Sequence, residues 1–80
     1  MKIPRDLSGL QLAKALRALN YKIVRQEGSH LRLTTERDGE HHVTVPAHTP
    51  LKVGTLNSIL KLVAAHHRIS VGELLHLLEL

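Results

Sequence analysis

The sequence predicts an α+β fold in which a three-stranded antiparallel sheet is covered on one face by helices. Two observations support this prediction. Three segments rich in β-forming residues follow one another without an intervening helix, at residues 22–27, 30–35 and 41–46. Segments with the apolar spacing of helices stand before and after them, so the order is α-β-β-β-α-α. Grouped strands flanked by helices are typical of an antiparallel sheet with its helices on one side.

The first helix is expected to run from Ser8 to Asn20. Ser8 and Gln11 have the spacing of a capping box, and Leu7 and Leu12 have the spacing of a hydrophobic staple. Asn20 is a plausible stop before the first strand. Apolar residues then recur at helical intervals, at Leu12, Ala13, Leu16 and Leu19.

The first two strands, Lys22–Glu27 and His30–Thr35, are separated by only Gly28 and Ser29. Such a spacing predicts a β-hairpin, and glycine at the first loop position suits a type II′ turn, which requires a positive φ there. The third strand, His41–Pro46, follows a second turn at residues 37–39.

Two helices are predicted after the strands. The first should run from about Thr55 to His66 with Gly54 as its N-cap, and its core residues should be Leu56, Ile59, Leu60 and Val63. The last helix, about Ser70–Leu78, has another capping box at Ser70 and Glu73. Its surface of Leu74, Leu75, Leu77 and Leu78 either packs on the core or binds another chain.

Composition narrows the classes of function. The 80 residues suffice for one small domain, and the lack of cysteine excludes disulfides and thiolate metal sites. No apolar run approaches the roughly 20 residues that span a bilayer, and residues 1–6 lack the apolar core of a signal peptide, so we expect a cytoplasmic protein without a membrane partner. The net charge of +4 favours a polyanionic partner. Tyr21 is the single aromatic residue, which argues against base stacking on an aromatic platform.

Strand alternation predicts which side chains face away from the helices. If the leucines of the second strand point inward, His30 and Arg32 point outward. The two-residue loop would place Glu27 opposite His30 and Arg25 opposite Arg32. The open face thus collects Arg25, His30, Arg32 and His42, with Thr44 beside them. The same register turns Ile23 outward and Gln26 inward, which is unfavourable for both side chains.

A histidine beside a turn can support RNA cleavage without a metal. The 2′-hydroxyl of RNA is an internal nucleophile that chiefly needs a proton acceptor, a proton donor and stabilisation of negative charge. His30 would be the general acid or base, and Glu27 would orient its imidazole. Arg25, Arg32 or Lys52 would stabilise the charge of the transition state. A surface histidine without a chemical role is the simpler interpretation of these residues taken alone.

Three stretches stand in order behind the first helix: VRQEGSH at residues 24–30, VTVPAH at 43–48 and VGTLNSILK at 53–61. In this order and spacing they resemble the HicA toxins of bacterial and archaeal toxin–antitoxin pairs. The resemblance implies a fold similar to the double-stranded-RNA-binding domain and a ribosome-independent endoribonuclease that cleaves mRNA. From the chemistry of the 2′-hydroxyl we expect this cleavage to need no cofactor and no metal. The resemblance also implies a HicB-type antitoxin that covers the active site.

The family's catalytic histidine follows the Gly-Ser turn and corresponds to His30. The turn glycine corresponds to Gly28, whereas Leu31 stands where members of the family often have a polar residue or histidine. A second acid, base or orienting group would be His48 or Glu27. We expect RNA to contact Arg25, Arg32, Lys52, Thr44, Gly28 and Ser29.

Two other classes of function stay open at this point. The chain could be a module that binds duplex RNA by shape without cutting it, or an interaction protein that docks through its last helix. The paired histidines at 41–42 and 66–67 invite a metal hypothesis, but adjacent side chains diverge too far to chelate one ion locally. We expect them to have other roles, and the histidines at 66 and 67 should interact favourably with the C-terminal end of their helix. We also expect the free protein to be a monomer.

Overall fold

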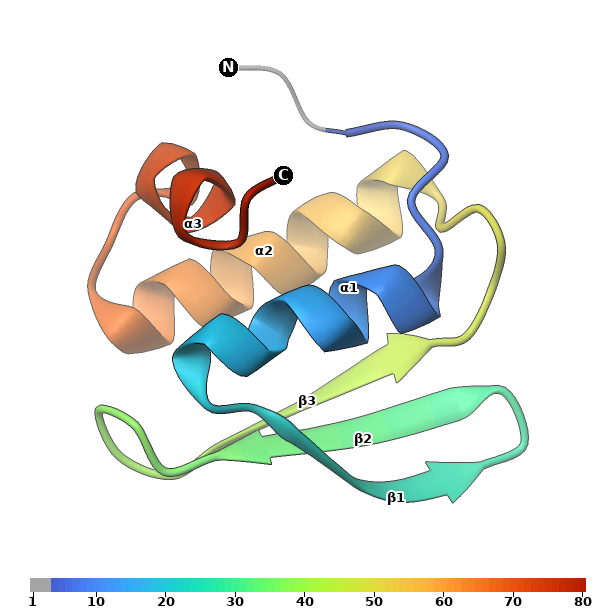
Figure 1. Ribbon diagram of the computed structural model, residues 1–80, viewed down its shortest axis with the longest axis horizontal. Coiled ribbons are helices and arrows are strands. Elements are labelled where there is room, and N and C mark those ends of the chain that lie inside the picture. The colour runs from blue at the N-terminus through green and yellow to red at the C-terminus, as the bar shows by residue number, and fades with distance from the viewer. Residues whose placement is uncertain (1–3) are drawn as a thin grey trace.

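The computed structural model describes residues 4–80. Its strands form one antiparallel sheet in the order β1-β2-β3, and the helices α1 and α2 lie over one face of it (Figure 1). The short helix α3 lies against α2 on the side away from the sheet (Figure 1). The predicted α+β fold is therefore confirmed. The elements are α1 (Gly9–Ala15), the 3₁₀ helix η1 (Leu16–Leu19), β1 (Lys22–Glu27), β2 (His30–Thr35), β3 (His41–Pro46), α2 (Val53–His67) and α3 (Val71–Leu77).

Both predicted capping boxes are present. The Ser8 hydroxyl accepts a bond of 3.1 Å from the Gln11 amide, and the Gln11 side chain accepts one of 2.8 Å from the Ser8 amide. Ser70 and Glu73 make the same reciprocal pair at the start of α3. Each box satisfies two amides that have no partner within the helix, which fixes where α1 and α3 begin. Asn20 ends η1 with φ of 64°, as its identity suggests.

The start of α2 differs from the prediction. Gly54 lies inside the helix rather than at its N-cap, which is Lys52 and makes no side-chain capping bond. The preceding residue, Leu51, is buried, and its amide donates to the Leu7 carbonyl at 2.8 Å. The packing of Leu51 thus sets where the chain enters the helix and overrides the local preference of glycine for a cap.

The core lies between the sheet and the helices. The four predicted core residues of α2 are buried, and so are Leu74 and Leu75 of α3 and Leu78 directly after it. Leu77 is the exception, with 47% of its surface exposed. Of the two interpretations of the last helix, packing on the core is therefore the one that the structure shows.

The pairing of β1 with β2 follows the expected register near the turn and departs from it further along. Glu27 pairs with His30 and Arg25 with Arg32, as predicted. A β-bulge at Val24 then shifts the register, so Ile23 pairs with Leu33 and lies on the helix side of the sheet. The expected outward orientation of Ile23 was therefore wrong, because a bulge reverses the alternation beyond it. Ile23 stays 47% exposed because β1 is an edge strand.

A cluster of histidines joins the end of α2 to the strands. The buried Tyr21 hydroxyl lies 2.7 Å from His41 Nδ1 and 3.2 Å from His67 Nε2. His67 Nδ1 lies 2.8 Å from the carboxylate of Asp38, and this hydrogen bond is the main reason that the pKa of Asp38 is lowered. His66 stacks on His41 with ring centroids 4.3 Å apart. The paired histidines therefore connect the loop before β3 to α2. This contact with a distant loop was not part of the prediction, which concerned only the end of the helix.

Proton sharing within this histidine cluster is constrained by Tyr21. Burial raises the pKa of Tyr21 to about 12, so its hydroxyl keeps its one proton at neutral pH. That proton can be donated to His41 or to His67, and the other imidazole must then donate to the phenol oxygen. The three side chains therefore form one coupled hydrogen-bond network.

His41 is expected to make the stability of the fold depend on pH. Burial, followed by the neighbouring imidazoles of His66 and His67, lowers its pKa below the usual 6.5. The unfolded chain then binds more protons, so stability is lost as the pH falls from about 6.5 through the folded pKa. Urea unfolding should therefore show a smaller loss of stability between about pH 7 and 5 for His41→Gln than for wild type. The exposed control His76→Gln should keep the wild-type profile; an equally steep loss in His41→Gln would contradict the assignment.

Candidate functional site

The open face of the sheet carries side chains in three rows that cross the strands. The rows follow from the register, because directly paired residues share a face. The four residues that strand alternation predicts for this face all belong to these rows and are exposed: Arg25, His30, Arg32 and His42. From the hairpin end the rows are Glu27, His30 and Pro46; then Arg25, Arg32 and Thr44; then Lys22, Thr34 and His42.

A cavity of about 250 Å³ occupies the first two rows. Its lining consists of Arg25, Glu27, His30, Arg32 and Thr44. Each of these five residues belongs to the set that the sequence suggested for catalysis or RNA contact. Two guanidinium groups thus share one small, exposed cavity with an imidazole, which is a combination suited to a phosphate group.

The hairpin holds His30 through its backbone on both sides. Gly28 has φ of +56°, and a Cβ there would meet no other atom within 4 Å, so the glycine serves the backbone conformation rather than packing. Ser29 lies outside the positive-φ region, as a type II′ turn requires. The Ser29 carbonyl accepts a hydrogen bond from the Ala47 amide, which fastens the turn to the residue after β3. The position of His30 is therefore set by both neighbouring strands.

Glu27 differs in its contact from the expected one. It pairs with His30 across the strands, but its carboxylate Oε1 lies 2.7 Å from Nε of Arg25. Both side chains are about two-thirds exposed, so solvent screens this ion pair and it adds little to stability. The effect of the ion pair is on position, because it holds the guanidinium of Arg25 beside Glu27, and both residues line the cavity. Within residues 4–80, Arg32 makes no ion pair.

Four of the suggested site residues lie outside the lining of this cavity. Gly28 and Ser29 form the adjacent turn, and Lys52 is the exposed N-cap of α2. His48 is exposed in the loop after β3, where its backbone carbonyl accepts a bond of 3.0 Å from the Gly9 amide. The carbonyl of His48 thus anchors α1, while its imidazole is not part of the cavity.

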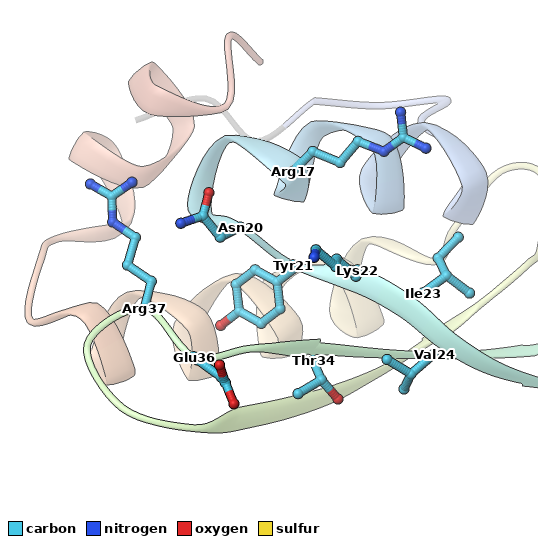
Figure 2. A pocket seen from close by; sticks show the side chains of 9 residues that line it. All are labelled: Arg17, Asn20, Tyr21, Lys22, Ile23, Val24, Thr34, Glu36 and Arg37. Carbon is cyan, nitrogen blue, oxygen red and sulfur yellow. The ribbon is translucent and has the colours of Figure 1, made fainter.

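A second, wider groove was not foreseen from the sequence. It has a volume of about 1100 Å³ and lies around the start of β1 (Figure 2). Its residues come from η1, the connection to β1, both hairpin strands and the loop after β2, so no local motif could have indicated it. They are Arg17, Asn20, Tyr21, Lys22, Ile23, Val24, Thr34, Glu36 and Arg37.

Grouped metal ligands and membrane-spanning helices are both absent from the part of the chain that the structure describes. Residues 4–80 contain no group of three or more His, Cys, Asp and Glu side chains arranged to hold a metal ion. None of the helices in this range has the length and apolar character needed to cross a membrane.

Comparison with known proteins identifies the family. The family model described as the HicA toxin of bacterial toxin–antitoxin matches residues 9–64, which is more than half of the chain. Searches of curated proteins and of solved structures gave no match. The matched range contains the hairpin, the cavity around His30 and most of α2. On the strength of this match, the chain belongs to the HicA toxin family of bacterial toxin–antitoxin systems.

Proposed function

We propose that this toxin is an endoribonuclease that cleaves mRNA independently of the ribosome and of metal ions, with His30 as general acid or base. The observation that carries the proposal is the cavity in which His30 lies with Arg25 and Arg32. A phosphodiester in this cavity would meet positive charge on its oxygens and a proton-transferring group beside its reacting bond. This combination matches what cleavage of RNA by its own 2′-hydroxyl requires.

The reaction needs one bond to form and one to break. The 2′-oxygen attacks the adjacent phosphorus, and the bond from phosphorus to the 5′-oxygen of the next nucleotide breaks. The products are a 2′,3′-cyclic phosphate and a 5′-hydroxyl. Neutral His30 would take the proton of the 2′-hydroxyl, or protonated His30 would give one to the leaving 5′-oxygen.

The other residues of the cavity have supporting roles in this proposal. Arg25 and Arg32 stabilise the charge that develops on the non-bridging oxygens, and Glu27 positions Arg25 through their ion pair of 2.7 Å. The Thr44 hydroxyl is a hydrogen-bond donor on the third strand of the same cavity. His48, two residues beyond the strand partner of His30, is the remaining choice for a second acid or base.

The surroundings of the site complete the proposal. RNA would also contact Gly28 and Ser29 at the turn and Lys52 at the start of α2. We propose that the partner protein is a HicB-type antitoxin that covers the cavity, and that both act in the cytoplasm, where mRNA is present. A free, uncovered cavity is then the active form of the toxin.

The chemistry of the products tests the proposal. Purified wild type, incubated with single-stranded RNA in EDTA, should give fragments that end in a 2′,3′-cyclic phosphate and begin with a 5′-hydroxyl, as read by mass spectrometry. Fragments with a 5′-phosphate would refute attack by the 2′-hydroxyl. Loss of cleavage in EDTA would refute independence from metal. Binding of intact duplex RNA without any cleavage would favour the non-catalytic module instead.

A further inference from the structure

We propose that the groove beside β1 is an extended binding site for the same RNA strand, in which Arg17 and Lys22 contact phosphates beyond the nucleotides at the cleaved bond. This inference rests on the proposed function and adds a second contact region to it. Three observations carry it: the groove adjoins the open face of the sheet at Lys22 and Thr34, it has an excess of positive charge, and it exposes apolar surface at an edge strand.

Continuity with the cavity comes from β2. This strand places His30, Arg32 and Thr34 on the same face at intervals of two residues. Thr34 lines the groove, whereas His30 and Arg32 line the cavity. The path along the strand from His30 to Thr34 is about 13 Å, which is longer than one nucleotide. A strand of RNA held at His30 therefore reaches the groove with a more distant phosphate.

The charge of the groove favours a polyanion. Arg17, Lys22 and Arg37 line it, against a single acid, Glu36. Within the described range, 4–80, Arg17 and Lys22 make no ion pair, so their charges are available to a ligand. Figure 2 shows Arg17 on the helix side of β1 and Thr34 on the sheet side, with Lys22 between them. A phosphate chain that passes the start of β1 would meet both cations in succession.

The apolar part of the groove suits sugars and bases. Ile23 and Val24 line it with 47% and 58% of their surfaces exposed. Both residues belong to β1, which is an edge strand, so no further strand covers them. An acidic protein segment would also complement the positive charge of the groove. The row of Arg25 and Arg32, however, lies between the groove and His30, so positive charge is continuous up to the proposed catalytic residue. This continuity favours the RNA substrate as the ligand.

The test compares two double variants of equal charge. Arg17→Gln with Lys22→Gln removes the two proposed contacts, and Lys14→Gln with Lys61→Gln removes two exposed cations that do not line the groove. Both pairs are placed in the His30→Ala background, and binding to a long single-stranded RNA and to a dinucleotide is measured over a range of salt. The groove variant should lower the slope of log affinity against log salt for the long RNA by about 1.4 relative to the control. Affinity for the dinucleotide should be equal in both.

Each contrary outcome points to a different failure. Suppose that wild type cuts RNA, but the groove variant binds the long RNA with the same affinity and salt dependence as the control variant. The groove proposal is then overturned, and the proposed function stands. An equal loss for the long RNA and the dinucleotide would place the two cations at the cleaved bond and also overturn it. Loss of antitoxin binding with unchanged RNA binding would assign the groove to a protein. If wild type neither cuts nor binds RNA, the proposed function itself fails.

Discussion

Replacing His30 by alanine is expected to lower kcat for RNA cleavage by ~10²–10⁴-fold, the range that a positioned general acid or base contributes. The side chain is exposed on the open face and makes no core contact, so its removal should leave the fold unchanged. Arg25 and Arg32 remain in the cavity and should keep RNA affinity close to that of wild type. Single-turnover cleavage of a labelled RNA with enzyme in excess measures the chemical step directly.

Two other histidine variants sharpen the interpretation of His30→Ala. His76 is exposed on α3, and His76→Ala should cleave at the wild-type rate. The variant His48→Ala tests whether His48 is a second proton-transfer group or a loop residue without a chemical role. A large fall in kcat would give its imidazole a chemical role. A His30→Ala protein that folds, binds RNA and still cuts at the wild-type rate would remove His30 from the mechanism.

A substitution of Gly9 by alanine is expected to lower the free energy of unfolding by about 1–3 kcal/mol, the usual cost of overpacking. A Cβ at this position would lie 1.8 Å from the Pro46 carbonyl oxygen and 2.9 Å from Ala47 Cα. These are backbone atoms at the end of β3, so no side chain can rotate to make room. The start of α1 would have to move away from the sheet, which would weaken the bond of 3.0 Å between the Gly9 amide and the His48 carbonyl.

The matched control for Gly9 is Gly54, a glycine near the start of α2. A Cβ at Gly54 would meet nothing within 4 Å. Gly54→Ala should therefore raise the free energy of unfolding by about 0.5–1 kcal/mol, because alanine loses less conformational entropy in a helix. Urea titrations of both variants should show midpoint shifts of opposite sign. Shifts of the same sign would mean that the close approach of α1 to β3 does not limit the residue at position 9.

The strands and two of the helix starts could be predicted because their signals are local. The capping boxes at Ser8 and Ser70 and the Gly-Ser turn each fix a boundary within four residues of chain. The hairpin turn also set the register from Glu27 to Arg25. The residues that line the small cavity all lie on the three strands. Strand alternation alone therefore predicted that four of the side chains share the open face.

Features that depend on distant parts of the chain could not be predicted. The bulge at Val24 carries no glycine or proline signal, and the start of α2 is set by the burial of Leu51 against the core. The histidine cluster could not be predicted because Tyr21 precedes β1, whereas His41 stands on β3 and His67 on α2, far apart in the sequence. Pattern analysis of one segment at a time can exclude local chelation by adjacent histidines, but it cannot show which remote side chain each of them meets.

The bulge in β1 has a consequence for how this chain behaves among copies of itself. An edge strand with regularly spaced amides and carbonyls is a template on which a second chain can add a strand. At Val24 the spacing is interrupted, and the cationic residues Lys22 and Arg25 stand on either side of the interruption. Two such edges brought together would meet with mismatched hydrogen-bonding groups and like charges. The irregular strand thus protects a small, basic protein from aggregation through the same edge that borders its groove.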